Sequence, residues 1–403
     1  MSGGYGGLLR TRGVARSIAA QLVARFPSGM LSLGLLFHVE RATHSFGAAG
    51  VVLAALSIGQ ALSGPATGRL MGRVGMRPVI IATAIACAAA VAVIALVPMP
   101  VAGVVALALV AGLAFPPITA AVRTIYPKLV NARMLTPLYS LDASLQEIIW
   151  IGGPVAVTFV ATTLGTELGL MLSVALLLGG GAWFAASPEV GRVRIPRSRR
   201  RFGAVLARPP VLLSTVVGFL VIAACADIEA SVPGAFGTTS PLSGVVLAIW
   251  SLASLVGGIL LGRLPMRPWS LALRLLIVTA GAALLPFVSG FAGICGALVV
   301  AGFGLAPALG MMSAIVSSSV RFSDTAEAYG WTNTGQLIGA ALGAALAGWF
   351  LDLAGARAAF ASGAVLAVIG LLVAVAAHRA TPDLRGRDAG PVPDTAPVPV
   401  QSA

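Results

Sequence analysis

The chain has 403 residues, of which 58% are hydrophobic and 10% are charged, and its formal net charge is +13. Soluble domains carry about 25% charged residues, so the composition excludes a soluble protein and indicates one embedded in a lipid bilayer.

Twelve apolar runs are long enough to cross the hydrocarbon core, which needs about 20 helical residues. The predicted spans are residues 17–38, 46–67, 78–97, 101–122, 137–160, 168–187, 211–232, 241–261, 271–289, 291–316, 329–352 and 358–378. We therefore expect an all-α integral membrane protein with twelve transmembrane helices.

The basic residues predict the orientation of these helices. With the amino terminus in the cytoplasm, the outer side receives only Arg41 and Arg357, and all other basic clusters, including Arg123 and Arg274, are cytoplasmic. This asymmetry follows the positive-inside rule. It predicts a multi-pass protein of the cell inner (plasma) membrane with cytoplasmic N- and C-termini, and it excludes nucleic acid as the partner of the positive charge.

The first two spans each contain one polar candidate. Arg25 lies about 12 Å along the first helix from its cytoplasmic start. Charges in hydrocarbon are costly and usually mark a functional cavity, so Arg25 is a candidate for a charge network. Gln60 in the second span is a candidate for the substrate cavity, or it joins helices by hydrogen bonds.

The segment "GRLMGRVGMRP", residues 68–78, follows the second span. It is a candidate gating loop, and the alternative is that its arginines only mark topology. The residues concerned are Gly68, Arg69, Gly72, Arg73, Gly75 and Arg77.

The fifth span carries two acids, Asp142 and Glu147, at depths of about 9 and 16 Å. Both depths allow pairing with Arg25, so we expect Arg25 to pair with Asp142, with Glu147 or with both. At 100° per residue the two acids lie about 140° apart on a polar face, and they need not do the same job. Gln146 and Trp150 share this face and are substrate-cavity candidates.

Glu147 is the candidate for proton coupling because it is nearer the midplane. A carboxyl that is neutral in one access state and ionised in the other couples proton movement to conformation. The alternative is a permanently paired structural carboxylate.

Asp227 and Glu229 lie near the outer end of the seventh span. They are candidates for an outer vestibule of the cavity. The alternative, slightly favoured because both residues lie close to water, is that they are interfacial residues with no special role.

The segment "GRLPMRP", residues 262–268, repeats the first loop in shortened form and adds Arg263 and Arg267 to the gating candidates. The matches run in register over about 100 residues. At an offset of 194, residues 50–54 match 244–248, Ser57 matches Ser251, and 68–70 match 262–264. At an offset of 190, residues 76–78 match 266–268, 111–112 match 301–302, Pro117 matches Pro307, and Gln146 matches Gln336.

The repeat predicts two pseudo-symmetric six-helix bundles of parallel topology. Such repeats place a substrate site near the membrane midplane between the halves. The expected organisation is a bundle at 1–187, a basic cytoplasmic linker at 188–210, a bundle at 211–380 and a disordered cytoplasmic tail at 381–403.

Trp331, Asn333 and Gln336 place aromatic and amide groups early in the eleventh span. They are cavity candidates. Hydrogen bonding between helices is an equally good interpretation.

The chain has no phosphate-binding Gly-Lys loop and no cluster of metal ligands, and its three cysteines lie singly in apolar runs. We therefore expect neither an enzyme nor an ATP-driven pump, and no cofactor or metal.

The loop at 68–78 resembles the signature between the second and third helices of the major facilitator superfamily. Gly68, Leu70, Arg73, Gly75 and Arg77 stand at the matching positions. The resemblance implies a secondary transporter that works by alternating access, with a gating role for this loop.

One position departs from the superfamily. Gly72 stands where its members usually have an aspartate that latches the cytoplasmic side of the two halves. The arginines of the loop can still bind helix carbonyls or acids of the other half. "ARFPSGM" at 24–30 and "GGP" at 152–154 resemble actinobacterial drug-exporter-type members.

The expected function is proton-coupled efflux, by antiport, of a small hydrophobic or drug-like compound. The alternative is an uptake symporter or facilitator for a small organic solute, and a transport-dead membrane sensor ranks third. We expect a monomer whose partners are the small-molecule substrate, protons and the lipid bilayer.

Overall fold

The computed structural model describes residues 5–198, 200–236, 242–262, 264, 266–384 and 390–394. The first half consists of α1 (Tyr5–Arg10), α2 (Val14–Arg25), α3 (Pro27–Thr43), α4 (Phe46–Val74), α5 (Met76–Leu96), α6 (Val101–Leu113), α7 (Ile118–Leu129), α8 (Ala132–Thr163) and α9 (Thr166–Ala186). The connecting segment contains α10 (Pro188–Arg192) and the 3₁₀ turn η1 (Ala204–Ala207).

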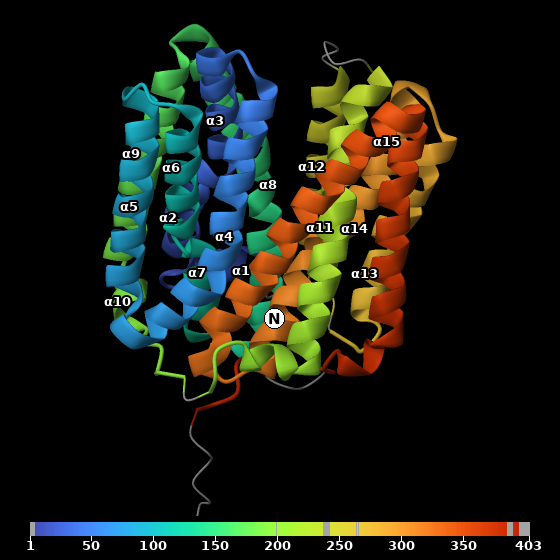
Figure 1. The fold of residues 1–403 in the computed structure, drawn as a ribbon. Helices are drawn as coiled ribbons and strands as arrows, with labels where there is room; N and C mark the ends of the chain where they lie inside the picture. The colour runs from blue at the N-terminus through green and yellow to red at the C-terminus, as the bar shows by residue number, and fades with distance from the viewer. Residues whose placement is uncertain are drawn as a thin grey trace, which may run out of the picture.

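The second half consists of α11 (Pro209–Phe236), α12 (Leu242–Leu261), α13 (Ser270–Leu284), η2 (Leu285–Phe287), α14 (Gly290–Ser319), η3 (Phe322–Asp324), α15 (Thr325–Ala376) and η4 (His378–Ala380). Figure 1 shows the two halves side by side, with their helices close together at one end and spread apart at the other. The all-α fold in two helical bundles is the predicted one.

The element α15 consists of two helices, and the second of them is the twelfth crossing. By length and composition, the described residues contain eleven candidate spans, the last of them 55 residues long. Gly355, inside it, has φ +76°, a conformation that glycine adopts without a Cβ penalty. The contacts of α15 with α11 show that the chain reverses there (Figure 1): the first arm runs parallel to α11 and the second antiparallel. The contacting pairs are Thr215 with Gly335, Phe219 with Gly339 and Ala223 with Gly343, then Asp227 with Gly363 and Leu220 with Gly370.

Prolines explain where the helices depart from the predicted spans. The first span is divided into α2 and α3 at Pro27, which has no N–H to continue the ladder of α2. The fourth is divided at Pro116 and Pro117, which lie between α6 and α7. Pro307, the repeat partner of Pro117, instead lies inside the continuous helix α14.

The internal repeat is visible in the packing. Gly112 of α6 lies against the backbone of Leu56, and Gly302 of α14 lies in the same way against Trp250 of α12. Tyr139 and Tyr329, 190 positions apart, face each other across the pseudo-two-fold axis with ring centroids 6.4 Å apart. Their hydroxyls donate to carbonyls that are also 190 positions apart, those of Arg123 (3.2 Å) and Ser313 (2.9 Å).

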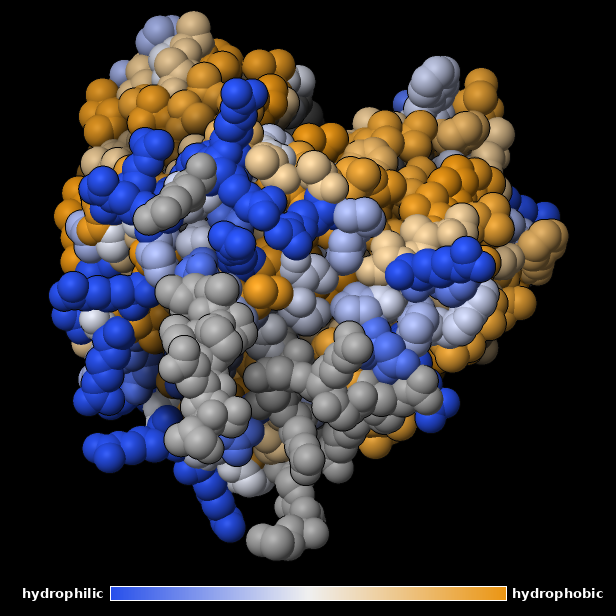
Figure 2. Space-filling model, turned by 90° about the horizontal axis from the view of Figure 1, so that it is seen from below, coloured by the Kyte–Doolittle hydropathy of each residue, from blue (hydrophilic) through white to orange (hydrophobic). Residues whose placement is uncertain are grey.

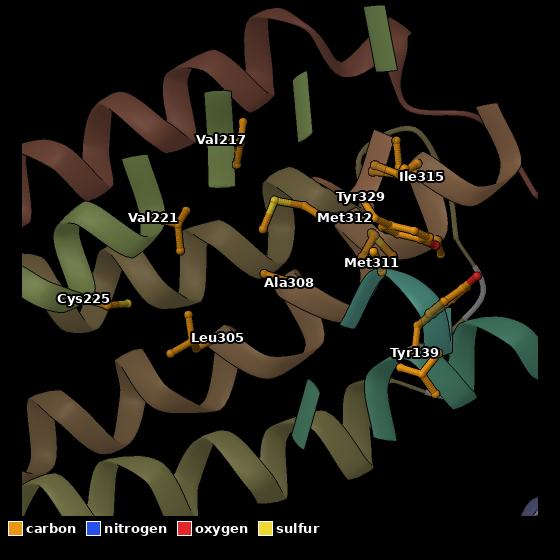
Figure 3. Packing of buried hydrophobic residues seen from close by; sticks show 14 of the residues in the cluster. Tyr139, Val217, Val221, Cys225, Leu305, Ala308, Met311, Met312, Ile315 and Tyr329 are labelled. Atoms are coloured by element: carbon orange, nitrogen blue, oxygen red, sulfur yellow. The ribbon is translucent and has the colours of Figure 1, made fainter. Parts of the chain in front are cut away.

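The hydrophobic core reaches this tyrosine pair. Figure 3 shows Met311, Met312 and Ile315 of α14 beside Tyr329, with Tyr139 approaching from the other half. All five side chains are buried in one apolar cluster. The core therefore extends through the junction between the halves.

Close backbone contacts hold the two halves together at one end. A Cβ added to Gly330 of α15 would lie 2.5 Å from the backbone of Gly64 of α4, and one on Gly68 would lie 2.5 Å from the carbonyl oxygen of Ala326. Small residues permit such approach between membrane helices. We call this crossing of α4 and α15 the seam.

The repeat places a second crossing on the other side of the axis. Gly258 of α12 and Gly262, directly after this helix, are the partners of Gly64 and Gly68 at an offset of 194, and they lie against Ser144 and Ser140 of α8. Glycine thus recurs in the repeated segments where the halves touch.

The seam lies at the end of the molecule that carries the loop at 68–78 and the linker, which we call the basic end. Figure 2 views this end and shows hydrophilic side chains gathered on it. Val392 of the tail pairs with the chain beside Arg321, and Asp394 accepts a hydrogen bond from Ser323 Oγ (2.6 Å).

Disorder was expected throughout the tail, 381–403. Residues 390–394 instead have defined partners, because backbone pairing of Val392 and the Asp394 carboxylate tie this segment to residues 320–323, just before α15. Residues 385–389 and 395–403 lie outside the described residues.

Gly330→Ala is expected to open the seam. Its Cβ must move from 2.5 Å to an ordinary contact distance, which forces α4 and α15 apart by about 1 Å. Spin labels at Val74 and Leu264, both exposed at the basic end, should report a longer distance distribution in a cysteine-free background.

Gly348→Ala is the matched control, because Gly348 lies on the same arm of α15 with nothing within 4 Å of its Cβ position. Equal distance distributions in both variants would contradict the role of the seam.

Candidate functional site

A cavity of about 400 Å³ lies between the first half and α15, directly beyond the seam as seen from the basic end. This volume suits a drug-sized ligand. Its walls include Leu53, Phe115 and Leu337, together with several serine and threonine side chains. Among the predicted site residues, those that line it are Arg25, Gln60, Gln146, Trp150 and Asn333.

Arg25 ends α2 at the cavity wall and forms an ion pair with Asp142 of α8. Its Nη1 donates to Asp142 Oδ1 at 3.2 Å, and both side chains are buried. Of the two partners that the sequence allowed, the structure brings only Asp142 to Arg25. Nη1 also donates to Gln21 Oε1 (2.7 Å), and Nη2 donates to Gln146 Oε1.

Arg123 of α7 is the second cation at Asp142. Its Nε donates to Asp142 Oδ2 at 3.1 Å, and Tyr126 Oη donates to Asp142 Oδ1 at 2.9 Å. Arg123 was expected to be a topology marker in the cytoplasm, but its side chain is buried within the protein beside the carboxylate of Asp142. We call Arg25, Arg123 and Asp142 the charge cluster.

Arg274 was also placed in the cytoplasm, and the structure buries it. It lies on the first turn and a half of α13, where its Nη2 donates to the Leu261 carbonyl at 3.0 Å. The guanidinium group of Arg274, which the sequence pattern placed in the cytoplasm, thus binds the carbonyl at the end of α12.

Glu147 lies halfway along α8 and points away from the charge cluster. It accepts a hydrogen bond from Ser254 Oγ of α12 at 2.7 Å. This bond joins the two halves on the side of the axis opposite to the cavity. Ser254 is the repeat partner of Gln60, and Glu147 is that of Leu337, which lines the cavity.

Asp227 and Glu229 do not line the cavity. Asp227 is fully buried and accepts a hydrogen bond from Ser362 Oγ (2.6 Å), because α11 extends to Phe236 and the second arm of α15 packs over this turn. The expected vestibule position for Asp227 was therefore wrong. Glu229 is exposed on the same helix.

Trp331 and Gln336 are also outside the cavity lining. Trp331 packs on Phe202 of the linker, with ring centroids 5.6 Å apart. Gln336 lies against Gly218 of α11, because it faces the interior of the second half. Of the three candidates in the eleventh span, only Asn333 faces the cavity.

The basic end is closed by ionic contacts between the halves. Arg69 Nη1 lies 3.6 Å from Glu327 Oε2 in the first turn of α15, and the Gly203 N–H donates to Glu327 Oε1 at 2.7 Å. Asp324 accepts a hydrogen bond from Ser198 Oγ (2.6 Å) and lies 3.6 Å from Arg200 Nε. The linker thereby takes part in this closure.

Arg77 binds the carboxyl end of α9. Its Nε donates to the Ala185 carbonyl at 2.8 Å, and its Nη2 lies 3.3 Å from the Ser187 carbonyl oxygen. The sequence allowed the arginines of this loop to bind either helix carbonyls or acids of the other half. Arg69 contacts an acid of the other half, and Arg77 contacts helix carbonyls.

The other residues of the loop occupy the turn between α4 and α5. Gly75 has φ +96°, which favours glycine at the end of a helix. A Cβ on Gly72 would lie 3.2 Å from the Pro196 carbonyl oxygen, so the linker occupies the space beside this position. Arg73 is exposed, as is Arg267 in the second copy. Arg263 lies outside the described residues.

Sequence reasoning missed Tyr126, Glu327 and Asp324 as partners in these networks. A usable signal existed for the two acids, because they stand immediately before the eleventh span in the half opposite to the arginine loop. Tyr126 carries no such signal, since the break at Pro117 sets the direction in which α7 points.

A family model described as Major Facilitator Superfamily matches residues 18–264 and 228–400. No curated protein matches the chain by sequence.

Several solved structures share the fold. The human organic anion transporter MFSD10 (TETRAN) has TM-score 0.69 and 17% identity, covering 90% of this chain and 99% of that one. The E. coli fucose:proton symporter FucP has TM-score 0.71 and 14% identity over 91% and 99%. The proton:xylose symporter XylE has TM-score 0.72 and 12% identity over 93% and 96%.

Asp142→Asn is expected to destabilise the protein by about 3–5 kcal/mol, because it leaves two buried guanidinium groups without a carboxylate. Tyr126→Phe is the control and should cost about 1 kcal/mol, since it removes one hydrogen bond to the same carboxylate. Denaturant unfolding in micelles, followed by tryptophan fluorescence, measures both. Similar small losses would contradict the buried charge cluster.

Glu327→Gln is expected to loosen the basic end because it removes the charge that faces Arg69. In a cysteine-free background, Thr67→Cys, buried beside the seam, should react at least about fivefold faster with an impermeant maleimide supplied at the basic end.

Asp352→Asn is the control, because Asp352 is an exposed carboxylate on the same helix. An unchanged labelling rate in Glu327→Gln would show that the ion pair does not hold the seam closed.

Proposed function

The chain belongs to the major facilitator superfamily and is therefore a membrane transporter rather than an enzyme, and from this premise we propose that it exchanges protons for a small, largely apolar organic compound, which it exports. The basic end faces the cytoplasm in this proposal, in keeping with the positive-inside rule. The compound occupies the cavity beyond the seam, and the proton binds at Glu147.

The observation that carries the proposal is the position of Glu147. It lies halfway along α8, its carboxylate accepts a hydrogen bond from Ser254 of the other half, and the ion pairs in the described part of the chain do not include it. A carboxylate held across the junction of two moving bodies changes its surroundings whenever they move. Proton binding is thereby linked to the access state.

The cavity supports a substrate with a large apolar surface. Its leucine and phenylalanine walls bury such a surface, and the hydroxyl and amide groups of Ser28, Gln60 and Asn333 offer orientation through hydrogen bonds. Trp150 also lines the cavity and provides an aromatic face for the substrate.

The seam and the Arg69–Glu327 contact act as the cytoplasmic gate. In this arrangement the gate is closed, and the helices spread apart at the opposite end (Figure 1). For substrate to reach the cytoplasm, α4 must separate from α15 and α8 from α12. The second separation acts directly on the Glu147–Ser254 bond.

The test is proton movement in energised inside-out vesicles. A panel of antibiotics and of lipophilic cations, anions and neutral compounds is added, and the pH gradient is followed by fluorescence quenching. Wild-type protein should dissipate the gradient with at least one compound. Glu147→Gln should lose this response and keep the exchange of labelled compound at equilibrium, because it still binds and rocks.

Glu167→Gln is the matched control, since Glu167 is an exposed carboxylate at the start of α9, and it should behave as wild type. Wild-type gradient dissipation in Glu147→Gln would remove this residue from coupling. Protons and compound moving in the same direction would replace antiport by uptake symport.

A further inference from the structure

We infer that the compound carried by this transporter bears one negative charge, which is recognised by the surplus positive charge of Arg25, Arg123 and Asp142. The inference rests on the proposed transport function and names the substrate class of its cavity.

The charge cluster is unbalanced. Two guanidinium groups share one carboxylate: Asp142 pairs with Arg25 at 3.2 Å and with Arg123 at 3.1 Å. Asp142 also accepts the Tyr126 hydroxyl, so both of its oxygens are hydrogen-bonded. One positive charge remains in a buried site, where the interaction between charges is much stronger than in water.

No other acid in the described residues forms an ion pair with Arg25 or Arg123, and Glu327 of α15 pairs with Arg69 instead. Glu147 lies on the same helix as Asp142 but faces Ser254 of α12. Across the seam, α15 presents Tyr329, whose ring lies under the Arg123 guanidinium at 6.0 Å, and the neutral Asn333. On α4 the cavity is lined by uncharged side chains such as Gln60.

Arg25 gives the surplus access to the cavity. Both Arg25 and Gln146 line its wall, and Arg25 Nη2 donates to the amide oxygen of Gln146. A carboxylate of the substrate can take the place of this neutral acceptor. Hydrogen bonds between ionised partners are about twice as strong as neutral ones, so this exchange favours an anion.

The size and walls of the cavity define the rest of the compound. A volume of about 400 Å³ with apolar walls accommodates an aromatic or aliphatic body. A surplus of one charge matches one carboxylate or sulfonate. A dianion would leave a negative charge buried without a partner, which is costly.

The experiment measures binding to the full-length protein in nanodiscs by calorimetry. Naphthyl, decyl and adamantyl bodies are each supplied as the carboxylate, the amide and the trimethylammonium compound. We expect the carboxylates to bind at least tenfold more tightly than the amides, and the cations most weakly.

Gln146→Glu neutralises the surplus without removing an arginine. It should weaken carboxylate binding at least tenfold and leave amide binding within twofold. Gln146→Met is the matched variant, because it removes the amide and keeps the surplus charge, and the preference for carboxylates should persist. Gln336→Glu makes the same chemical change outside the cavity and should bind as wild type does.

Three results would overturn the inference: wild-type protein that binds none of the carboxylates, equal affinity for carboxylates and amides, or an unchanged preference in Gln146→Glu. Glu147→Gln separates this inference from the proposed function. It should keep the preference for carboxylates whether or not it couples to protons, so failure of proton coupling alone leaves the charge selectivity standing.

Discussion

Close backbone approach between helices of opposite halves is the constraint on which this structure depends. Lipid tails are as apolar as leucine, so no hydrophobic force holds two membrane helices together, and tight packing must supply the attraction. Gly64 and Gly330 at one crossing and Gly258 at the other provide that packing. The cavity, the Arg69–Glu327 contact and the Glu147–Ser254 bond all lie beside these two crossings.

The frame is symmetric, and the chemistry placed on it is not. Tyr139 and Tyr329 share one arrangement across the pseudo-two-fold axis. The repeat positions of Asp142 and Arg123 are occupied by the neutral Thr332 and Ser313 in the second half. The first half therefore carries the charge cluster, and the second half lines the cavity with uncharged side chains of α15 such as Asn333 and Leu337.

The sequence was sufficient to predict the spans, the repeat and the pairing of Arg25 with an acid of the fifth helix, because burial period and depth follow from helix geometry. It could not predict that Arg123 is buried, since this depends on the break at Pro117 and on the neighbouring helix α8. It placed Asp227 in a vestibule for a related reason: the residue lies 9 positions before the end of α11, and only the returning arm of α15 determines what covers it. Which helices lie next to each other depends on tertiary packing, and no local sequence pattern encodes it.

The reversal at Gly355 limits how the last two crossings can shift. Its two arms lie within a single stretch of 55 residues, and both pack against α11. Gly339 of the first arm lies against Phe219, and Gly363 of the second arm lies against Asp227. A displacement of α11 relative to one arm therefore requires a displacement relative to the other, so these three crossings form one mechanical unit.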